Sequence, residues 1–147
     1  MTLKTLLATL ALGLSLGLPA IPVLADGSHN SVSVQQWGAR NGIGVGQGGY
    51  RNRLSVTQDG YGNTSIATQD GARNRTAIGQ TGSHNSAVTT QSGRCNVLGV
   101  AQFGSGNSAE LDQAGGCNAM SVIQTGRGGS VDAQQYGHGN VTVIVQD

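Results

Sequence analysis

The chain has 147 residues, of which 25 are glycine, and only 10% of its side chains are charged and 3% aromatic. This composition supplies too little bulk for an ordinary globular core, and its low charge excludes a typical charge-solvated disordered chain. The length suits one domain, so we expect a narrow structure filled by small side chains and amides.

Residues 1–25 differ from the rest and have the features of a secretory signal peptide. Lys4, the only lysine, precedes a long apolar run, and the segment ends in small residues at Ala25. We predict cleavage after Ala25; the alternative is an uncleaved membrane anchor, because the apolar run approaches the length of a membrane span. The predicted mature domain, 26–147, carries seven arginines and seven acidic residues and is expected to be secreted.

An eleven-residue unit repeats along the predicted domain, and such a fixed period indicates stacked structural repeats. Counted from its glutamine, each unit has glutamine at position 1, glycine at position 3 and asparagine at position 6, where Gly129 is the exception. The glutamines are Gln36, Gln47, Gln58, Gln69, Gln80, Gln91, Gln102, Gln113, Gln124, Gln135 and Gln146. The glycines are Gly38, Gly49, Gly60, Gly71, Gly82, Gly93, Gly104, Gly115, Gly126 and Gly137. The asparagines are Asn30, Asn41, Asn52, Asn63, Asn74, Asn85, Asn96, Asn107, Asn118 and Asn140.

The same period could come from a right-handed helical coiled coil, but the glycines exclude it, because each would cost a helix about 1 kcal/mol. We therefore predict a turn at positions 2–5 and a β-strand at positions 6–11 that runs into the next glutamine. Positions 8 and 10 hold apolar residues such as Leu54 and Val56, whereas positions 7, 9 and 11 hold residues such as Arg53 and Glu110. Period-two alternation then places positions 6, 8, 10 and 1 inside and the charged positions outside.

Two such strands facing each other form a coil of 22 residues, and the chain holds about five of them. Successive coils are expected to pair in parallel and in register, at about 4.7 Å. The predicted fold is an all-β, amyloid-like β-solenoid of strand–turn–strand coils. Identical glutamines and asparagines would stack, each amide bonding the next, which satisfies polar groups that are costly to bury unpaired.

Cys95 and Cys117 both fall at position 5 and lie 22 residues apart. In the predicted coil they share one turn column on neighbouring coils, within the usual Cα range for a disulfide. An exported protein also meets an oxidising environment. We predict a disulfide between them, with two free thiols or an intermolecular bridge as the alternatives.

Units such as Gln102-x-Gly104-x-x-Asn107-x-Ala109-x-x-x-Gln113 resemble the curlin repeat of bacterial curli fibre subunits. The resemblance implies a structural protein of an extracellular amyloid fibre at the cell surface, serving the biofilm matrix and cell adhesion. It also implies the partners: further copies of the chain in a homopolymeric fibre, a nucleator or major subunit, a curli-type outer-membrane secretion pore and a periplasmic chaperone.

No catalytic, metal or cofactor site is expected from the sequence. The histidines His29, His84 and His138 fall in different turns, and Asp59 and Asp70 fall on opposite turns rather than as a carboxylate pair. Basic residues predominate in the first repeat units of the chain and acidic residues in the last ones. No basic stripe persists along the chain, so a nucleic-acid partner is not expected. We therefore predict that the chain is not an enzyme.

The apolar stretch 141–146 is expected to be an assembly end, because an uncapped strand edge is a template for a further strand. The alternative function is a monomeric secreted β-solenoid that binds a glycan or an ice surface. That function needs a flat array of repeated outward residues, and the outward threonines are scattered over three positions of the repeat.

Overall fold

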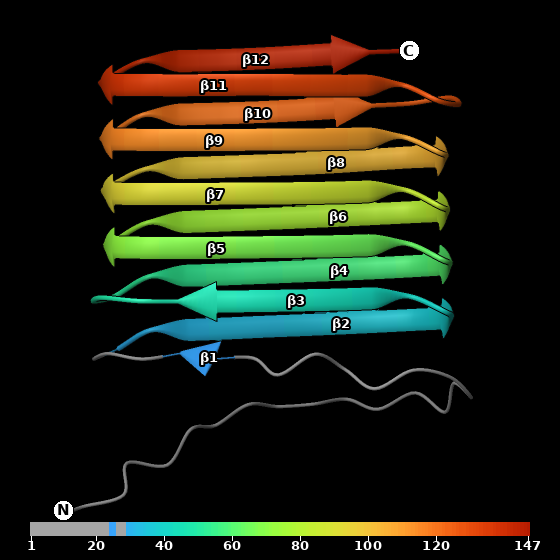
Figure 1. The fold of residues 1–147 in the computed structure, drawn as a ribbon, viewed down its shortest axis with the longest axis horizontal. Helices are drawn as coiled ribbons and strands as arrows, with labels where there is room; N and C mark the ends of the chain where they lie inside the picture. The colour runs from blue at the N-terminus through green and yellow to red at the C-terminus, as the bar shows by residue number, and fades with distance from the viewer. Residues whose placement is uncertain (1–23, 26–28) are drawn as a thin grey trace, which may run out of the picture.

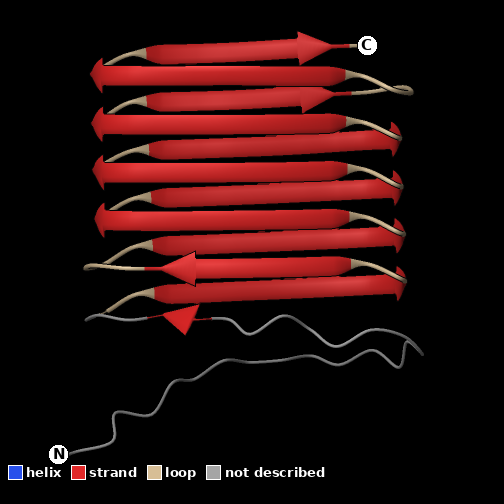
Figure 2. Ribbon diagram, in the orientation of Figure 1, coloured by secondary structure: helices blue, strands red, loops and turns tan. Residues whose placement is uncertain are grey.

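A computed structural model describes residues 24–25 and 29–147, and all its regular elements are β-strands (Figures 1 and 2). In this part of the chain no helix is long and apolar enough to cross a membrane. Apart from β1, the predicted signal peptide lies outside the described residues. The strands are β1 Leu24–Ala25, β2 Ser31–Ala39, β3 Gly42–Gln47, β4 Arg53–Tyr61, β5 Thr64–Ala72, β6 Arg75–Ser83, β7 Ser86–Arg94, β8 Val97–Ser105, β9 Ser108–Gly116, β10 Ala119–Gln124, β11 Ser130–His138 and β12 Val141–Gln146.

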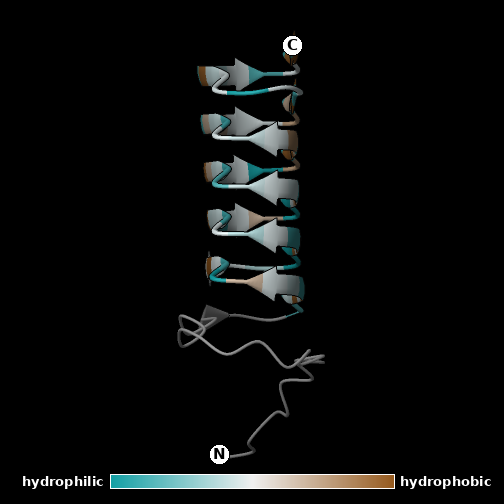
Figure 3. Cartoon of the chain, turned by 90° about the vertical axis from the view of Figure 1, so that its right-hand side faces the viewer, coloured by the Kyte–Doolittle hydropathy of each residue, from teal (hydrophilic) through white to brown (hydrophobic). Residues whose placement is uncertain are grey.

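The strands alternate between two parallel six-stranded sheets, one made of the odd-numbered strands and the other of the even-numbered strands. Each strand pairs with the next strand of its own sheet in a register of 22 residues, as when Val56 pairs with Ile78. Figure 1 shows successive strands running in opposite directions up the column, and Figure 3 shows that the column is only two layers thick. The predicted β-solenoid with a 22-residue coil is confirmed.

A thin core lies between the inner faces of the two sheets. Positions 8 and 10 of the repeat supply its apolar side chains, among them Leu98 and Leu111, each 1% exposed. The alternation is visible within β4, where Leu54, Val56 and Gln58 are buried and the residues between them are not. The two-residue period therefore places the side chains as the sequence predicts.

The strands are longer than predicted at their carboxyl ends. A turn was expected over positions 2–5, but most strands continue through the position-3 glycine to position 4, as β4 continues through Gly60 to Tyr61. The chain reverses over positions 5 and 6 instead. Glycine at position 3 has a positive φ, +125° at Gly60, which lets the strand bend while its pairing with the next coil continues.

Position 5 is left-handed in every turn, whether or not it is glycine. Left-handed backbone is uncommon for other residues because Cβ then crowds the carbonyl oxygen. The non-glycine residues with positive φ, all at position 5, are His29, Arg40, Arg51, Arg73, His84, Cys95 and Cys117.

Candidate functional site

The glutamines form two continuous ladders, one on the inner face of each sheet. Each Nε2 donates to the Oε1 of the glutamine 22 residues later, over distances from 2.7 to 3.2 Å. The even-sheet ladder runs from Gln36 to Gln146 and the odd-sheet ladder from Gln47 to Gln135. Because Gln58 to Gln124 are at most 1% exposed, these bonds satisfy amides that water cannot reach.

Several of these amides use their second N–H to donate a hydrogen bond across the core to the opposite sheet. Gln58 Nε2 donates to the Gly42 carbonyl at 3.1 Å and to Ser65 Oγ at 3.0 Å. Gln69 Nε2 likewise contacts Thr76 Oγ1 at 2.9 Å. These hydroxyls replace apolar side chains at position 8, and the glutamines make the replacement possible. The sequence pattern treats position 8 as apolar and misses this coupling.

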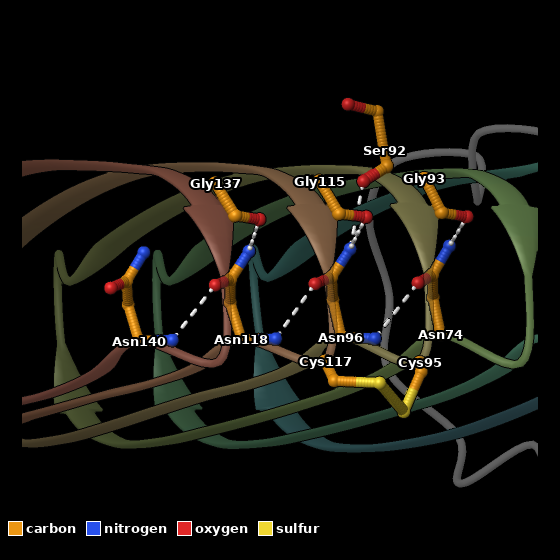
Figure 4. The surroundings of a disulfide bond; sticks show 10 residues. All are labelled: Asn74, Ser92, Gly93, Cys95, Asn96, Gly115, Cys117, Asn118, Gly137 and Asn140. Carbon is orange, nitrogen blue, oxygen red and sulfur yellow. Dashed lines mark hydrogen bonds between the residues drawn. A yellow bond between two sulfur atoms is a disulfide. The ribbon is translucent and has the colours of Figure 1, made fainter.

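The asparagines form a different network from the one the sequence suggested. Asn96 Nδ2 donates to the carbonyl oxygens of Ser92 at 2.8 Å and Gly115 at 3.1 Å, and Asn96 Oδ1 accepts from the backbone N–H of Asn118 at 3.0 Å (Figure 4). Position 6 lies in the corner, where backbone groups leave the regular strand pairing. Asparagine therefore bonds side chain to backbone, whereas an amide-to-amide ladder was expected.

The same corner contacts recur along the solenoid. Asparagine Oδ1 accepts a hydrogen bond from the backbone N–H 22 residues later. Asn30 accepts from Asn52 in this way, and Asn107 accepts from Gly129. Gly129 thus keeps the donor of its position and lacks only the side chain. The corner motif therefore holds each coil to the next, except that the unit at Gly129 has no side-chain amide to contribute.

The position-3 glycines stack directly on one another, and all of them have positive φ. A Cβ built on Gly82 would overlap the carbonyl oxygen of Gly104, and the same overlap recurs at each of these glycines from Gly38 to Gly115. Glycine is therefore required here both by the backbone conformation and by the closeness of the next coil.

A profile of the curlin-associated repeat matches residues 49–82, a segment that contains β4, β5 and most of β6. This segment is similar to a curlin-associated repeat, which supports the curlin resemblance of the sequence. No curated protein sequence matches it significantly. The glutamine ladder and the asparagine corner of the matched segment continue at the same spacing as far as Gln146 and Asn140.

Curlin repeats in a β-solenoid point to a structural, non-enzymatic protein of the curli-subunit type. Among the described residues, no group of three or more His, Cys, Asp and Glu side chains could hold a metal ion. Two of the histidines contact tyrosines instead: His29 lies edge-on to Tyr50 at 5.5 Å, and His84 to Tyr61 at 5.6 Å between ring centroids.

Two neighbouring coils also carry a covalent cross-link. A disulfide joins Cys95 to Cys117 at the same position of neighbouring coils, with Cα atoms 4.4 Å apart (Figure 4). Neither cysteine is a free thiol in this structure.

The outer face of the even-numbered sheet is apolar toward β12; the sequence analysis identified the apolar stretch 141–146 but not this outward-facing strip. Val141, Val143 and Val145 are 75%, 66% and 64% exposed, and Val97 extends the same strip on β8. The sequence analysis described the outward positions by the charged side chains that other units carry there, such as Arg53 and Glu110. Comparing positions 7, 9 and 11 within the even-numbered strands alone would have revealed this strip.

Proposed function

We propose that the chain is a structural subunit of an extracellular, curli-like functional amyloid fibre, built by templated stacking of β-coils. The observation that supports this most strongly is the glutamine ladder, in which each amide both donates to the next coil and accepts from the previous one. A coil added at either end meets a surface on which its own amides have partners ready.

Backbone pairing would extend in the same way. Within the described solenoid, β2 pairs only with β4, β11 only with β9, and β12 only with β10. Each of these strands therefore has an edge of backbone donors and acceptors that can template a further strand. We propose β12 as one assembly end, and its exposed valines as a surface against which a second sheet packs.

The wider role follows from the curlin repeat. The fibre would serve the biofilm matrix and cell adhesion after removal of residues 1–25. Export would use a curli-type outer-membrane pore and a periplasmic chaperone, and growth would start from a nucleator or major subunit.

Assembly of purified residues 26–147 at neutral pH without shaking tests the proposal. We expect thioflavin fluorescence to rise after a lag that seeds abolish, and fibre diffraction to show reflections near 4.7 and 10 Å. A stable, soluble monomer that seeds cannot convert would contradict it and favour the binding-module alternative.

A further inference from the structure

Four of the seven arginines gather at one edge of the solenoid, in one turn column of two neighbouring coils. Arg51 and Arg73 occupy position 5 of the turns that lead into β4 and β6, and Arg53 and Arg75 begin those strands as direct parallel partners. These side chains surround a hollow of about 370 Å³. The residues that line it are His29, Arg51, Arg53, Arg73, Asn74 and Arg75.

The positive charge in this hollow has no carboxylate partner among the described residues. Within the described residues, none of the four arginines forms an ion pair with a carboxylate. Like charges on directly paired strands are destabilising, and the register here pairs Arg53 with Arg75. The next residue in that column is Val97, so the repeat itself does not require arginine at this position.

The backbone adds a second cost. Arg51 and Arg73 have φ values of +57° and +58°, whereas the same column has glycine at Gly139. A left-handed conformation costs a non-glycine residue about 1–2 kcal/mol. Every position 5 is left-handed, so this cost alone does not mark a site, but at Arg51 and Arg73 it coincides with uncompensated charge.

We propose that this hollow binds the carboxylate groups of an acidic polysaccharide. A guanidinium group binds a carboxylate through two parallel hydrogen bonds. The arginine pairs repeat from one coil to the next at about 4.7 Å, so they suit a ligand that itself carries carboxylates in series. This proposal does not depend on fibre assembly, because the hollow lies within one chain.

The surroundings favour a polysaccharide over a nucleic acid. Single-stranded nucleic acids need free aromatic faces for base stacking. The nearby Tyr50 ring is already occupied, by the Arg51 guanidinium at 4.8 Å and by the His29 ring at 5.5 Å. Duplex binding needs a positive surface that follows many phosphates, and the basic region covers only two turns.

Fluorescence anisotropy with a labelled oligogalacturonate tests the site on the folded chain. Arg73→Gln should weaken binding about tenfold, the effect of losing one strong charge-assisted contact. Arg40→Gln is the matched control, because Arg40 also occupies position 5 with φ +58° but lies in the other turn column, outside the hollow. It should change the affinity less than about threefold, since a distant charge is screened by salt.

A methyl-esterified oligogalacturonate, galacturonic acid monomer and single-stranded and duplex DNA complete the comparison. The acidic oligomer should bind more tightly than all of these. Equal weakening by Arg73→Gln and Arg40→Gln, or no binding of the acidic oligomer, would overturn the site. Tighter binding of DNA or equal binding of the monomer would overturn the ligand class. If Arg73→Gln does not fold, Arg53→Gln, at the exposed start of β4, provides the same test.

Discussion

Cys95 and Cys117 are bonded to each other across neighbouring coils, at a left-handed turn position that both share. The solenoid brings them together simply because identical positions of successive coils are adjacent. The bond therefore fixes a register that the glutamine and asparagine contacts already define. It also closes a loop in the unfolded chain and so reduces the conformational entropy of the unfolded state.

Replacing both cysteines by serine should lower the free energy of unfolding by about 3 kcal/mol, the chain-entropy expectation for a closed loop of this length. Urea unfolding of the oxidised protein, the reduced protein and the Cys95→Ser/Cys117→Ser variant measures this. The reduced protein and the variant should coincide. Equal midpoints for the oxidised and reduced protein would contradict the prediction.

The glutamine ladder predicts that replacing one buried glutamine by glutamate, which exchanges the amide nitrogen for an oxygen, strongly destabilises the fold. In Gln91→Glu the carboxylate would be buried, the donor to Gln113 would be lost, and the stack would gain a negative charge. Leaving a buried charge without a partner in this way costs about 3–5 kcal/mol. Burial raises the pKa of such a carboxyl, so the loss should appear as pH rises through that pKa and recede in acid.

The control for this exchange lies on β2. Gln35 is exposed on the outer face beside Thr57, so Gln35→Glu adds the same charge without burying it. Urea midpoints measured from acidic to neutral pH should fall steeply for Gln91→Glu and stay near wild type for Gln35→Glu. Similar curves for the two variants would show that the ladder contributes little.

The sequence predicts the solenoid well because every coil copies the previous one. A fixed period determines which residues stack, and alternation determines which face the core, so Gln58 and Val56 could be placed without coordinates. The turn boundaries could not, because Gly60 bends the strand without interrupting its pairing. The residue pattern alone cannot distinguish a bend in a strand from a break in its backbone pairing.

Two parts of the candidate sites needed three dimensions. The role of Asn96 depends on carbonyls that face the corner from Ser92 and Gly115, and repetition alone suggested amide stacking instead. The arginine hollow depends on one turn column that brings residues 22 apart in the sequence to the same edge, whereas a linear search for a basic stripe finds none. The corner contacts of Asn96 arise from backbone direction, which the residue pattern does not record.

Close stacking of the turn glycines predicts a sharp contrast between two alanine substitutions. Gly82→Ala would place a Cβ against the Gly104 carbonyl at φ +117°, so a backbone shift is required and unfolding should become easier by about 1–3 kcal/mol. Gly79→Ala has no atom closer than 4.0 Å to the added Cβ and should be neutral or slightly stabilising. Urea unfolding of both variants tests the contrast, and equal effects would contradict it.

The hydrogen bond from Tyr136 to Asp112 Oδ2, 2.7 Å long, predicts a pH effect. This bond, together with partial desolvation and the carboxylate charge, raises the pKa of Tyr136 above its ordinary value of 10.0. Folding thus favours the protonated phenol. The contribution to stability is present below the pKa of the unfolded chain and is lost as pH rises through the higher folded pKa.

An NMR titration of the Tyr136 ring measures this pKa directly. Asp112→Asn should lower it toward the ordinary value, because the amide carries no charge and is a weaker acceptor. Asp132→Asn is the control, since Asp132 is a neighbouring carboxylate on β11 that lies beside Glu110 and has no bond to Tyr136. A Tyr136 pKa that responds equally to the two substitutions would show that general charge, rather than the hydrogen bond, sets it.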